Sequence, residues 1–193
     1  MNESLMSLKY KLTVIFTLLF SIFGLDQLTK FWAVNNLMGK NSVIFLNGFF
    51  QFIYAENPGA FLGLGDRWSR ELRFIIFSLI VFIGLSCMLW YLLKKEKLKI
   101  NLYAYTFILA GGVGNLWDRV FHDDGHVIDF MLIEVWGPLR TGVFNVADIF
   151  IVIGVLLALL GEYIVKKSDW TTNQQTNKDV NPKDSISQTK SST

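Results

Sequence analysis

Asp129 and Asp148 are the two residues of this sequence whose type and position indicate catalysis. Neither aspartate has an obvious cationic partner close by in the chain, and ionisable groups in or beside apolar segments are functional candidates by default. Two carboxylates held close together cannot both ionise easily, so one of them keeps a proton. The ionised partner then acts as a general base on water, while the protonated one polarises a carbonyl group and serves the leaving amine. Since no serine or cysteine has a recognisable base beside it, the sequence favours water activated by two aspartates.

Other polar residues of the apolar segments occur in short pairs. Residues three or four positions apart share one face of a helix, so each pair is expected to point in one direction. Paired charges of this kind can also simply lock helices together. The pairs are Asp26 with Lys30, Asn115 with Asp118, and Asn145 with Asp148, and Arg119 follows the second pair.

The elements that must position these residues are membrane-spanning helices. The chain has 193 residues, of which 52% are hydrophobic, and the apolar residues are clustered into long runs. Crossing the hydrocarbon layer takes roughly 20 predominantly apolar residues. The sequence predicts a membrane all-α bundle of four transmembrane helices, with a small extracytoplasmic β-sheet layer. The predicted spans are residues 12–32, 74–93, 100–117 and 143–165, in one four-helix transmembrane domain of residues 1–167.

Lysines predict the orientation of the bundle. Four spans put both termini on one side, and the positive-inside rule makes the lysine-rich side cytoplasmic. All the polar pairs then map to the outer face, although the spans alternate in direction. The opposite face also carries basic residues, so the orientation depends mainly on the dense loop between spans two and three. The lysines on the predicted cytoplasmic side are Lys9, Lys11, Lys94, Lys95, Lys97, Lys99, Lys166 and Lys167.

Three further segments lie outside the predicted spans. Residues 42–46 and 49–54 flank Asn47-Gly48, a pair that favours a type I′ turn, so they predict a β-hairpin against the membrane surface. Residues 127–136 are rich in β-branched and aromatic types and are expected to add strands to the same layer. Residues 63–70 are expected to be a connecting loop. The polar tail of residues 168–193 has too few apolar residues to offset the entropy lost on ordering, and it is predicted to be a disordered cytoplasmic tail.

Five short stretches carry a resemblance to a known family. They occur in order over about residues 10–165, and together they are far more specific than any one alone. They are Asp26-Gln27-Leu28-Thr29-Lys30, Glu56-Asn57-Pro58-Gly59-Ala60, the segment 111–119, Val127-Ile128-Asp129-Phe130 and Phe144-Asn145-Val146-Ala147-Asp148. The chain resembles the lipoprotein signal peptidases, or signal peptidase II, which are bacterial aspartic peptidases.

The resemblance implies a role for each matched residue. Asp129 and Asp148 match the catalytic aspartates. The residues that match the peptide and lipid site are Asn57, Asn115, Arg119 and Asn145, and those that match supporting positions are Asp26, Lys30 and Asp118. Residues 61–63 and Ala110 depart from the family pattern, which puts fine substrate preference in doubt.

The resemblance also implies the reaction and its setting. The substrate would be a diacylglyceryl-modified prolipoprotein, cut just before its lipidated cysteine in the bacterial cytoplasmic (inner) membrane. Membrane lipid and globomycin-type inhibitors would be further partners, with no cofactor, no metal and no nucleic acid, and we expect a monomer.

Other interpretations remain open at this point. Asp26 with Lys30 is equally well a structural ion pair, and Arg119 is long enough to reach lipid headgroups. His122 and His126 have the spacing of zinc ligands on a helix, but Gly125 between them disfavours a continuous helix. A proton-coupled transporter would also use intramembrane carboxylates, yet its relay should extend across the bilayer, where Glu162 is the main inner candidate. A membrane scaffold would need none of them for activity.

Overall fold

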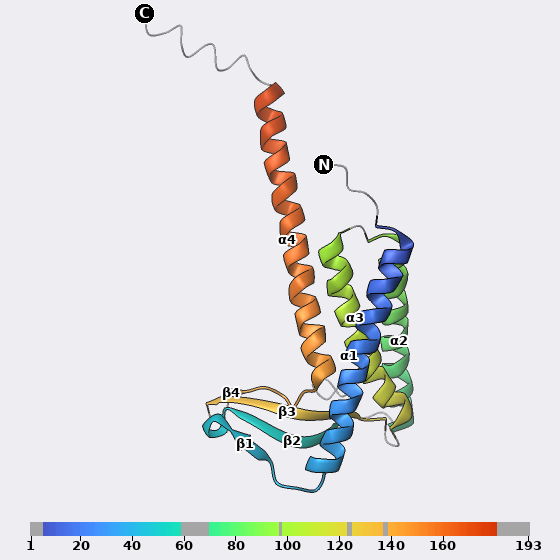
Figure 1. Ribbon diagram of the computed structural model, residues 1–193, viewed down its shortest axis with the longest axis vertical. Helices are drawn as coiled ribbons and strands as arrows, with labels where there is room; N and C mark the ends of the chain where they lie inside the picture. The colour runs from blue at the N-terminus through green and yellow to red at the C-terminus, as the bar shows by residue number, and fades with distance from the viewer. Residues whose placement is uncertain (1–5, 59–69, 97, 123–124, 137–138, 181–193) are drawn as a thin grey trace, which may run out of the picture.

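The computed structural model describes residues 6–58, 70–96, 98–122, 125–136 and 139–180. Within these ranges the chain forms four α-helices and one small sheet. The helices are α1 (Leu8–Leu37), α2 (Arg70–Lys94), α3 (Lys99–Phe121) and α4 (Val146–Val180). The strands are β1 (Val43–Phe45), β2 (Phe50–Asn57), β3 (Val127–Trp136) and β4 (Leu139–Arg140), with the 3₁₀ turn η1 (Leu46–Gly48) after β1. The sheet lies at one end of the helices, and the start of α1 and the end of α4 lie at the other (Figure 1).

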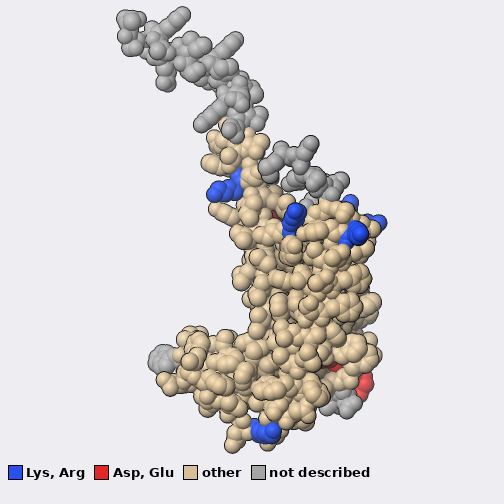
Figure 2. Space-filling view, viewed as in Figure 1, with Lys and Arg blue, Asp and Glu red and all other residues tan. Residues whose placement is uncertain are grey.

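Three of these helices are long and apolar enough to cross a membrane: α1, the Phe74–Lys94 part of α2 and the Val146–Thr172 part of α4. Most of their side chains face outward; only 6% of the most apolar stretch of α2 is buried inside the protein. A water-soluble protein rarely exposes such large apolar patches. Basic side chains gather at the end away from the sheet, and the visible middle of the bundle carries no charged side chain (Figure 2). The structure thus has helices able to span a membrane at three of the four predicted spans.

Helix α3 differs from the other three because it is the central helix. It contacts α1, α2 and α4, and ten of its residues are buried, including Asn101, Thr106, Asp118 and several glycines. A helix that neighbouring helices cover on several sides needs little lipid-facing apolar surface. Its lower hydropathy is therefore explained by its position, and its crossing of the membrane stays a prediction.

Small residues set how closely α3 approaches its neighbours. A methyl group added to Gly111 would contact the backbone of Ala147 at the start of α4. One added to Gly114 would come within 2.7 Å of the Asp26 carboxylate of α1. Glycines at these positions let the three helices pack closely where the polar pairs lie.

The sheet is antiparallel throughout, with strand order β1-β2-β3-β4. The predicted hairpin is confirmed, because Phe45 pairs with Phe50 and Val43 with Phe52. Its turn is longer than the predicted two-residue type I′ turn. Residues 46–49 connect the strands through η1, and the backbone has positive φ at Leu46, Asn47 and Gly48. The prediction of strands over residues 127–136 is confirmed by β3.

Aromatic side chains hold the sheet against the end of α1. The Trp32 ring meets the Phe52 ring edge-on at 5.4 Å between centroids, and the Phe130 ring at 6.4 Å. Buried Ala33 and Leu37 extend this contact along α1. Such pairs are favourable beyond the apolar area that they bury. They fix β3, and with it Asp129, relative to the helices.

The polar tail departs from the sequence prediction. Helix α4 continues to Val180, so residues 168–180, expected to be disordered, are helical, and residues 181–193 lie outside the described residues. The helix already formed by the apolar part of α4 supplies the costly nucleus, and extension then adds one hydrogen bond for each residue fixed. Of the predicted loop of residues 63–70, residues 63–69 lie outside the described residues, and Arg70 is the first residue of α2.

Lys11 closes the bundle at the end away from the sheet. Its side chain is buried, and Nζ donates to the carbonyl oxygens of Leu92 at 3.0 Å and Glu96 at 2.6 Å. Carbonyls at the end of a helix have no partner within the helix and favour a cation. The contact therefore ties the start of α1 to the end of α2.

We expect Lys11→Met to lower the free energy of unfolding by about 1.5–3 kcal/mol, the range for hydrogen bonds to charged groups. Thermal unfolding in detergent measures the effect. Lys9→Met is the matched control, because Lys9 is an exposed lysine two residues earlier on the same helix. Equal melting temperatures for the two variants would contradict a role for the buried lysine.

Candidate active site

Asp129 and Asp148 meet where the sheet joins the helices. Asp129 lies on β3 and is 2% exposed, and Asp148 lies in the first turn of α4. Asn145 connects the two carboxylates: its Nδ2 donates to Asp129 Oδ1 at 2.7 Å, and its backbone N–H donates to Asp148 Oδ2 at 3.1 Å. The structure thus brings together two aspartates that are 19 positions apart in the sequence and come from different kinds of element.

Local sequence explains why Asp148 points toward Asn145. Asn145 directly precedes α4, and its Oδ1 accepts the backbone N–H of Asp148 at 3.0 Å while the Asp148 carboxylate accepts the Asn145 N–H. This is a reciprocal capping box, here with aspartate in place of the usual glutamate. The i,i+3 spacing in the sequence predicts only that the two residues share one face of a helix. An asparagine three residues before an acid, at the start of an apolar run, is the pattern that indicates the cap.

The Asp129 carboxylate is held by two amides in a buried position. Besides Asn145, Asn57 at the end of β2 donates from Nδ2 to Asp129 Oδ2 at 3.1 Å. Burial, and next the negative charge of Asp148, raise the pKa of Asp129 to about 7, and the two amide hydrogen bonds act in the opposite direction. This is the arrangement in which one carboxyl of a pair keeps a proton near neutral pH.

Lys30 reaches Asp148 through Asn115. Lys30 Nζ donates to Asn115 Oδ1 at 3.1 Å, and Asn145 Nδ2 donates to the same oxygen at 3.0 Å. Two donors on its oxygen fix which way the Asn115 amide faces. Its Nδ2 then donates to Asp148 Oδ1 at 2.8 Å. Lys30 thereby helps to orient the hydrogen bond that Asn115 donates to Asp148.

The predicted pair of Asp26 and Lys30 is confirmed, and Asp118 completes it. Lys30 Nζ lies 2.8 Å from a carboxylate oxygen of each aspartate, and all three side chains are nearly inaccessible. Gln27 Nε2 donates to both carboxylates, at 3.1 Å to Asp26 and 2.9 Å to Asp118. Gln27 lies inside one of the five stretches that carry the family resemblance, but it is not among the residues predicted for the site.

Each of these two buried carboxylates also accepts a hydrogen bond from the backbone next to Asp129 or Asp148. Asp26 Oδ1 accepts the N–H of Ala147 at 2.9 Å, and Asp118 Oδ2 accepts the N–H of Ile128 at 3.2 Å. Ala147 precedes Asp148, and Ile128 precedes Asp129. One ammonium group therefore links the main-chain positions of both aspartates.

Arg119 and the histidines complete the account of the expected residues. Arg119 Nη1 donates to the Asn115 carbonyl oxygen at 3.2 Å, and its guanidinium interacts electrostatically with Asp118, Asp129 and Asp148. It is therefore turned toward the site. Helix α3 ends at Phe121, and Gly125 has φ of +67°, so His122 and His126 do not share the continuous helix that a zinc site of their spacing requires.

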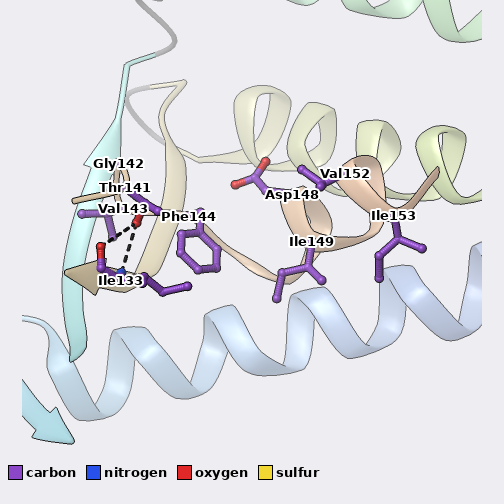
Figure 3. Close-up of a pocket in the computed structure, with 9 residues that line it drawn as sticks. All are labelled: Ile133, Thr141, Gly142, Val143, Phe144, Asp148, Ile149, Val152 and Ile153. Carbon is purple, nitrogen blue, oxygen red and sulfur yellow. Dashed lines mark hydrogen bonds between the residues drawn. The ribbon is translucent and has the colours of Figure 1, made fainter. Parts of the chain in front are cut away.

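An apolar pocket of about 470 Å³ opens beside Asp148. Figure 3 shows how its walls come from two places, the β3 and pre-α4 segments on one side and successive turns of α4 on the other. Asp148 is the sole ionisable residue among its lining residues, which are Ile133, Thr141, Gly142, Val143, Phe144, Asp148, Ile149, Val152 and Ile153. The arrangement suits an apolar chain whose polar, reactive end lies at the aspartates.

Comparison with known proteins relates this arrangement to one family. The model of the family described as "Signal peptidase (SPase) II" matches residues 18–164. A lipoprotein signal peptidase of Borreliella afzelii is 33% identical over 161 residues, which cover 82% of this chain and 94% of that protein. One of Shewanella oneidensis is 38% identical over 154 residues, which cover 77% of this chain and 85% of that protein.

A solved structure shares the fold as well. It is described as a bacterial membrane enzyme, and it superposes with a TM-score of 0.65 at 25% sequence identity. The superposition covers 76% of this chain and 90% of the other. The matched family region, residues 18–164, contains both aspartates and the other residues of the site.

Proposed function

The chain belongs to the signal peptidase II family, and we propose from this premise that it is an aspartic endopeptidase with Asp129 and Asp148 as its catalytic dyad. Its substrates are diacylglyceryl-modified prolipoproteins, which it cuts just before the lipidated cysteine. The observation that carries the proposal is Asn145, which joins the two carboxylates at the edge of an apolar pocket: its side-chain amide donates to Asp129 and its backbone N–H donates to Asp148.

In the proposed reaction the two aspartates share one proton. The ionised carboxylate takes a proton from a water molecule, which attacks the carbonyl carbon of the scissile peptide bond. The protonated carboxyl donates a hydrogen bond to the carbonyl oxygen, and a proton then passes to the leaving amine as the C–N bond breaks. Burial of Asp129 and the adjacent charge of Asp148 support Asp129 as the group that keeps the proton.

The pocket supports a lipid-bearing substrate. Its lining is almost wholly apolar, and it lies between the sheet and α4, a helix able to cross the membrane. An apolar lining replaces lipid contacts with protein contacts of similar polarity, so acyl chains can enter the pocket from the membrane without burying a polar group. The aspartates would face the outer leaflet of the cytoplasmic membrane, with four spans, both termini inside and the exposed apolar hairpin against the lipid surface. Basic side chains at the end opposite the sheet favour this orientation (Figure 2).

A gel-shift assay tests the proposal. Purified protein in detergent is given a diacylglyceryl-modified prolipoprotein, the unlipidated precursor, or the modified substrate with globomycin. We expect cleavage of the lipidated substrate only, and its inhibition by globomycin. A folded sample that cleaves neither substrate and does not bind globomycin would favour a transporter or a scaffold instead.

The pH dependence of cleavage should reflect the raised pKa of Asp129. Below about pH 7 the Asp129 carboxyl holds its proton, and above about pH 7 it loses that proton. The value of kcat/KM should therefore fall as the pH rises through about 7.

The hydrogen bond from Asn57 stabilises the ionised form of Asp129. Asn57→Ala should therefore raise the pKa of Asp129 and move the alkaline fall in kcat/KM to higher pH. Gln51→Ala, on the same strand but remote from the dyad, is the control. A limb that moves to lower pH in Asn57→Ala would contradict the assignment.

A further inference from the structure

A side-chain contact at the end of the β2–β3 ladder plays no part in the proposed chemistry. Glu56 Oε2 lies 3.3 Å from His126 Nδ1, and the Tyr54 hydroxyl donates to Glu56 Oε1 at 2.7 Å. The Glu56 and His126 side chains are 29% and 23% exposed, so their contact is partly accessible to solvent. The Tyr54 hydroxyl, and to a smaller extent His126, lower the pKa of Glu56, so its carboxylate is charged at neutral pH.

This contact lies on the opposite face of the sheet from the dyad. In the ladder Ala55 pairs with Asp129, Glu56 with Ile128 and Asn57 with Val127. Successive side chains of a strand point to opposite faces, so Asn57 and Asp129 share one face and Glu56 projects from the other. His126, two residues before Ile128, reaches Glu56 on that second face.

The Glu56–His126 contact lies where the pairing of β2 with β3 ends. Asn57 is the last residue of β2, and the next residue, Pro58, has no backbone N–H with which to extend the pairing. End rungs of a ladder open most readily. The Asn57 amide lies 3.1 Å from Asp129 while the final rung is closed, and separation of the strands there would carry the amide away from the carboxylate.

We propose that Glu56 and His126 are positioning residues for the cleavage reaction, which hold the last rung of the β2–β3 ladder closed so that Asn57 stays bonded to Asp129. The inference rests on the proposed function, since its effect is read through cleavage. Neither residue touches the dyad, and both act through Asn57. The hydrogen bond from the Tyr54 hydroxyl holds the Glu56 carboxylate near His126, which directly precedes β3.

The experiment is a double-mutant cycle on the cleavage rate of the full-length protein. Glu56→Ala and His126→Ala should each reduce kcat by about tenfold, within the range that small misplacements of supporting groups produce. In an Asn57→Ala background the same substitutions should cause no further loss, because the residue through which they act is gone. Glu56→Gln should keep most of the activity, since an amide can accept from Tyr54 and still bond to His126.

A second cross-strand contact on the same ladder supplies the control. At the far end Gln51 Nε2 donates to Glu134 Oε2 at 3.2 Å, in the same pair of strands but away from the dyad. Glu134→Ala should leave kcat unchanged. Equal losses for Glu56→Ala with and without Asn57, or an equal loss in Glu134→Ala, would show a merely structural role. An active wild type with an unaffected Glu56→Ala variant would overturn the positioning role alone, whereas an inactive, folded wild type would overturn the proposed function with it.

Discussion

Replacing Asp148 with asparagine is expected to reduce the cleavage rate by at least about a thousandfold, and Asp129→Asn is expected to do the same. Acid–base groups contribute about 10²–10⁴-fold each, and members of one catalytic unit lose most of the rate when either is removed. An asparagine cannot take a proton from water at position 148. At position 129 it cannot supply one to the leaving amine.

The fold should survive both substitutions. Asparagine has nearly the shape of aspartate, and its Oδ1 still accepts one of the two hydrogen bonds that each carboxylate receives. Its amide nitrogen would then face a donor, at a cost of about 1–3 kcal/mol. Single-turnover cleavage and thermal unfolding, measured side by side, separate lost chemistry from lost structure. Glu134→Gln, a carboxylate neutralised at the far end of β3, is the control. Retention of a tenth of the wild-type rate in either dyad variant would exclude the proposed mechanism.

Lys30→Met is expected to produce the largest loss of stability. It removes the shared partner of Asp26 and Asp118, and leaves two nearly inaccessible carboxylates facing each other. Removing one member of a buried ion pair costs about 3–5 kcal/mol, because the remaining charge is uncompensated. Activity should fall as well, because Asn115 loses one of the two donors that orient its amide toward Asp148.

Two further variants separate charge from position. In the triple variant Lys30→Met, Asp26→Asn, Asp118→Asn no charge is left unpaired, so we expect much of the lost stability to return while activity stays low. Lys11→Met is the matched control, a buried lysine at the far end whose partners are carbonyl oxygens. It should lower the melting temperature without lowering the cleavage rate of the folded protein. Recovery of full activity in the triple variant would mean that Lys30 acts only through stability.

Much of the site follows from the sequence because its parts are local. The i,i+4 pair of Asp26 and Lys30 forms within one helix, and the Asn145–Asp148 cap forms within one helical turn. The strand over residues 127–136 follows from its β-branched and aromatic composition. These features depend on neighbours along the chain, which a sequence displays directly.

The rest depends on tertiary contacts. The second carboxylate that pairs with Lys30 belongs to Asp118 on α3. It reaches α1 because glycines let the two helices approach closely, and the sequence around Asp118 does not show which helix it will contact. The backbone N–H groups of Ala147 and Ile128 bond to Asp26 and Asp118, and side-chain types alone do not predict such backbone contacts. Asn57 was expected at the site solely from the family resemblance, since it enters through the register of β2 with β3. Similarly, the helical continuation of α4 beyond residue 167 contradicts a composition-based expectation of disorder.

The linkage of Lys30 with Asp26 and Asp118 has a consequence for biosynthesis. Its members come from α1 and α3, and the backbone groups that they hold belong to β3 and to the start of α4, the last helix to be synthesised. Before α4 has inserted, Asp148 is absent from the site and Asp26 lacks the N–H of Ala147. If Asp129 and Asp148 are the catalytic pair, as proposed, a nascent chain without α4 holds only one of them and cannot yet cleave a substrate. Peptidase activity then arises only when α4 completes the bundle.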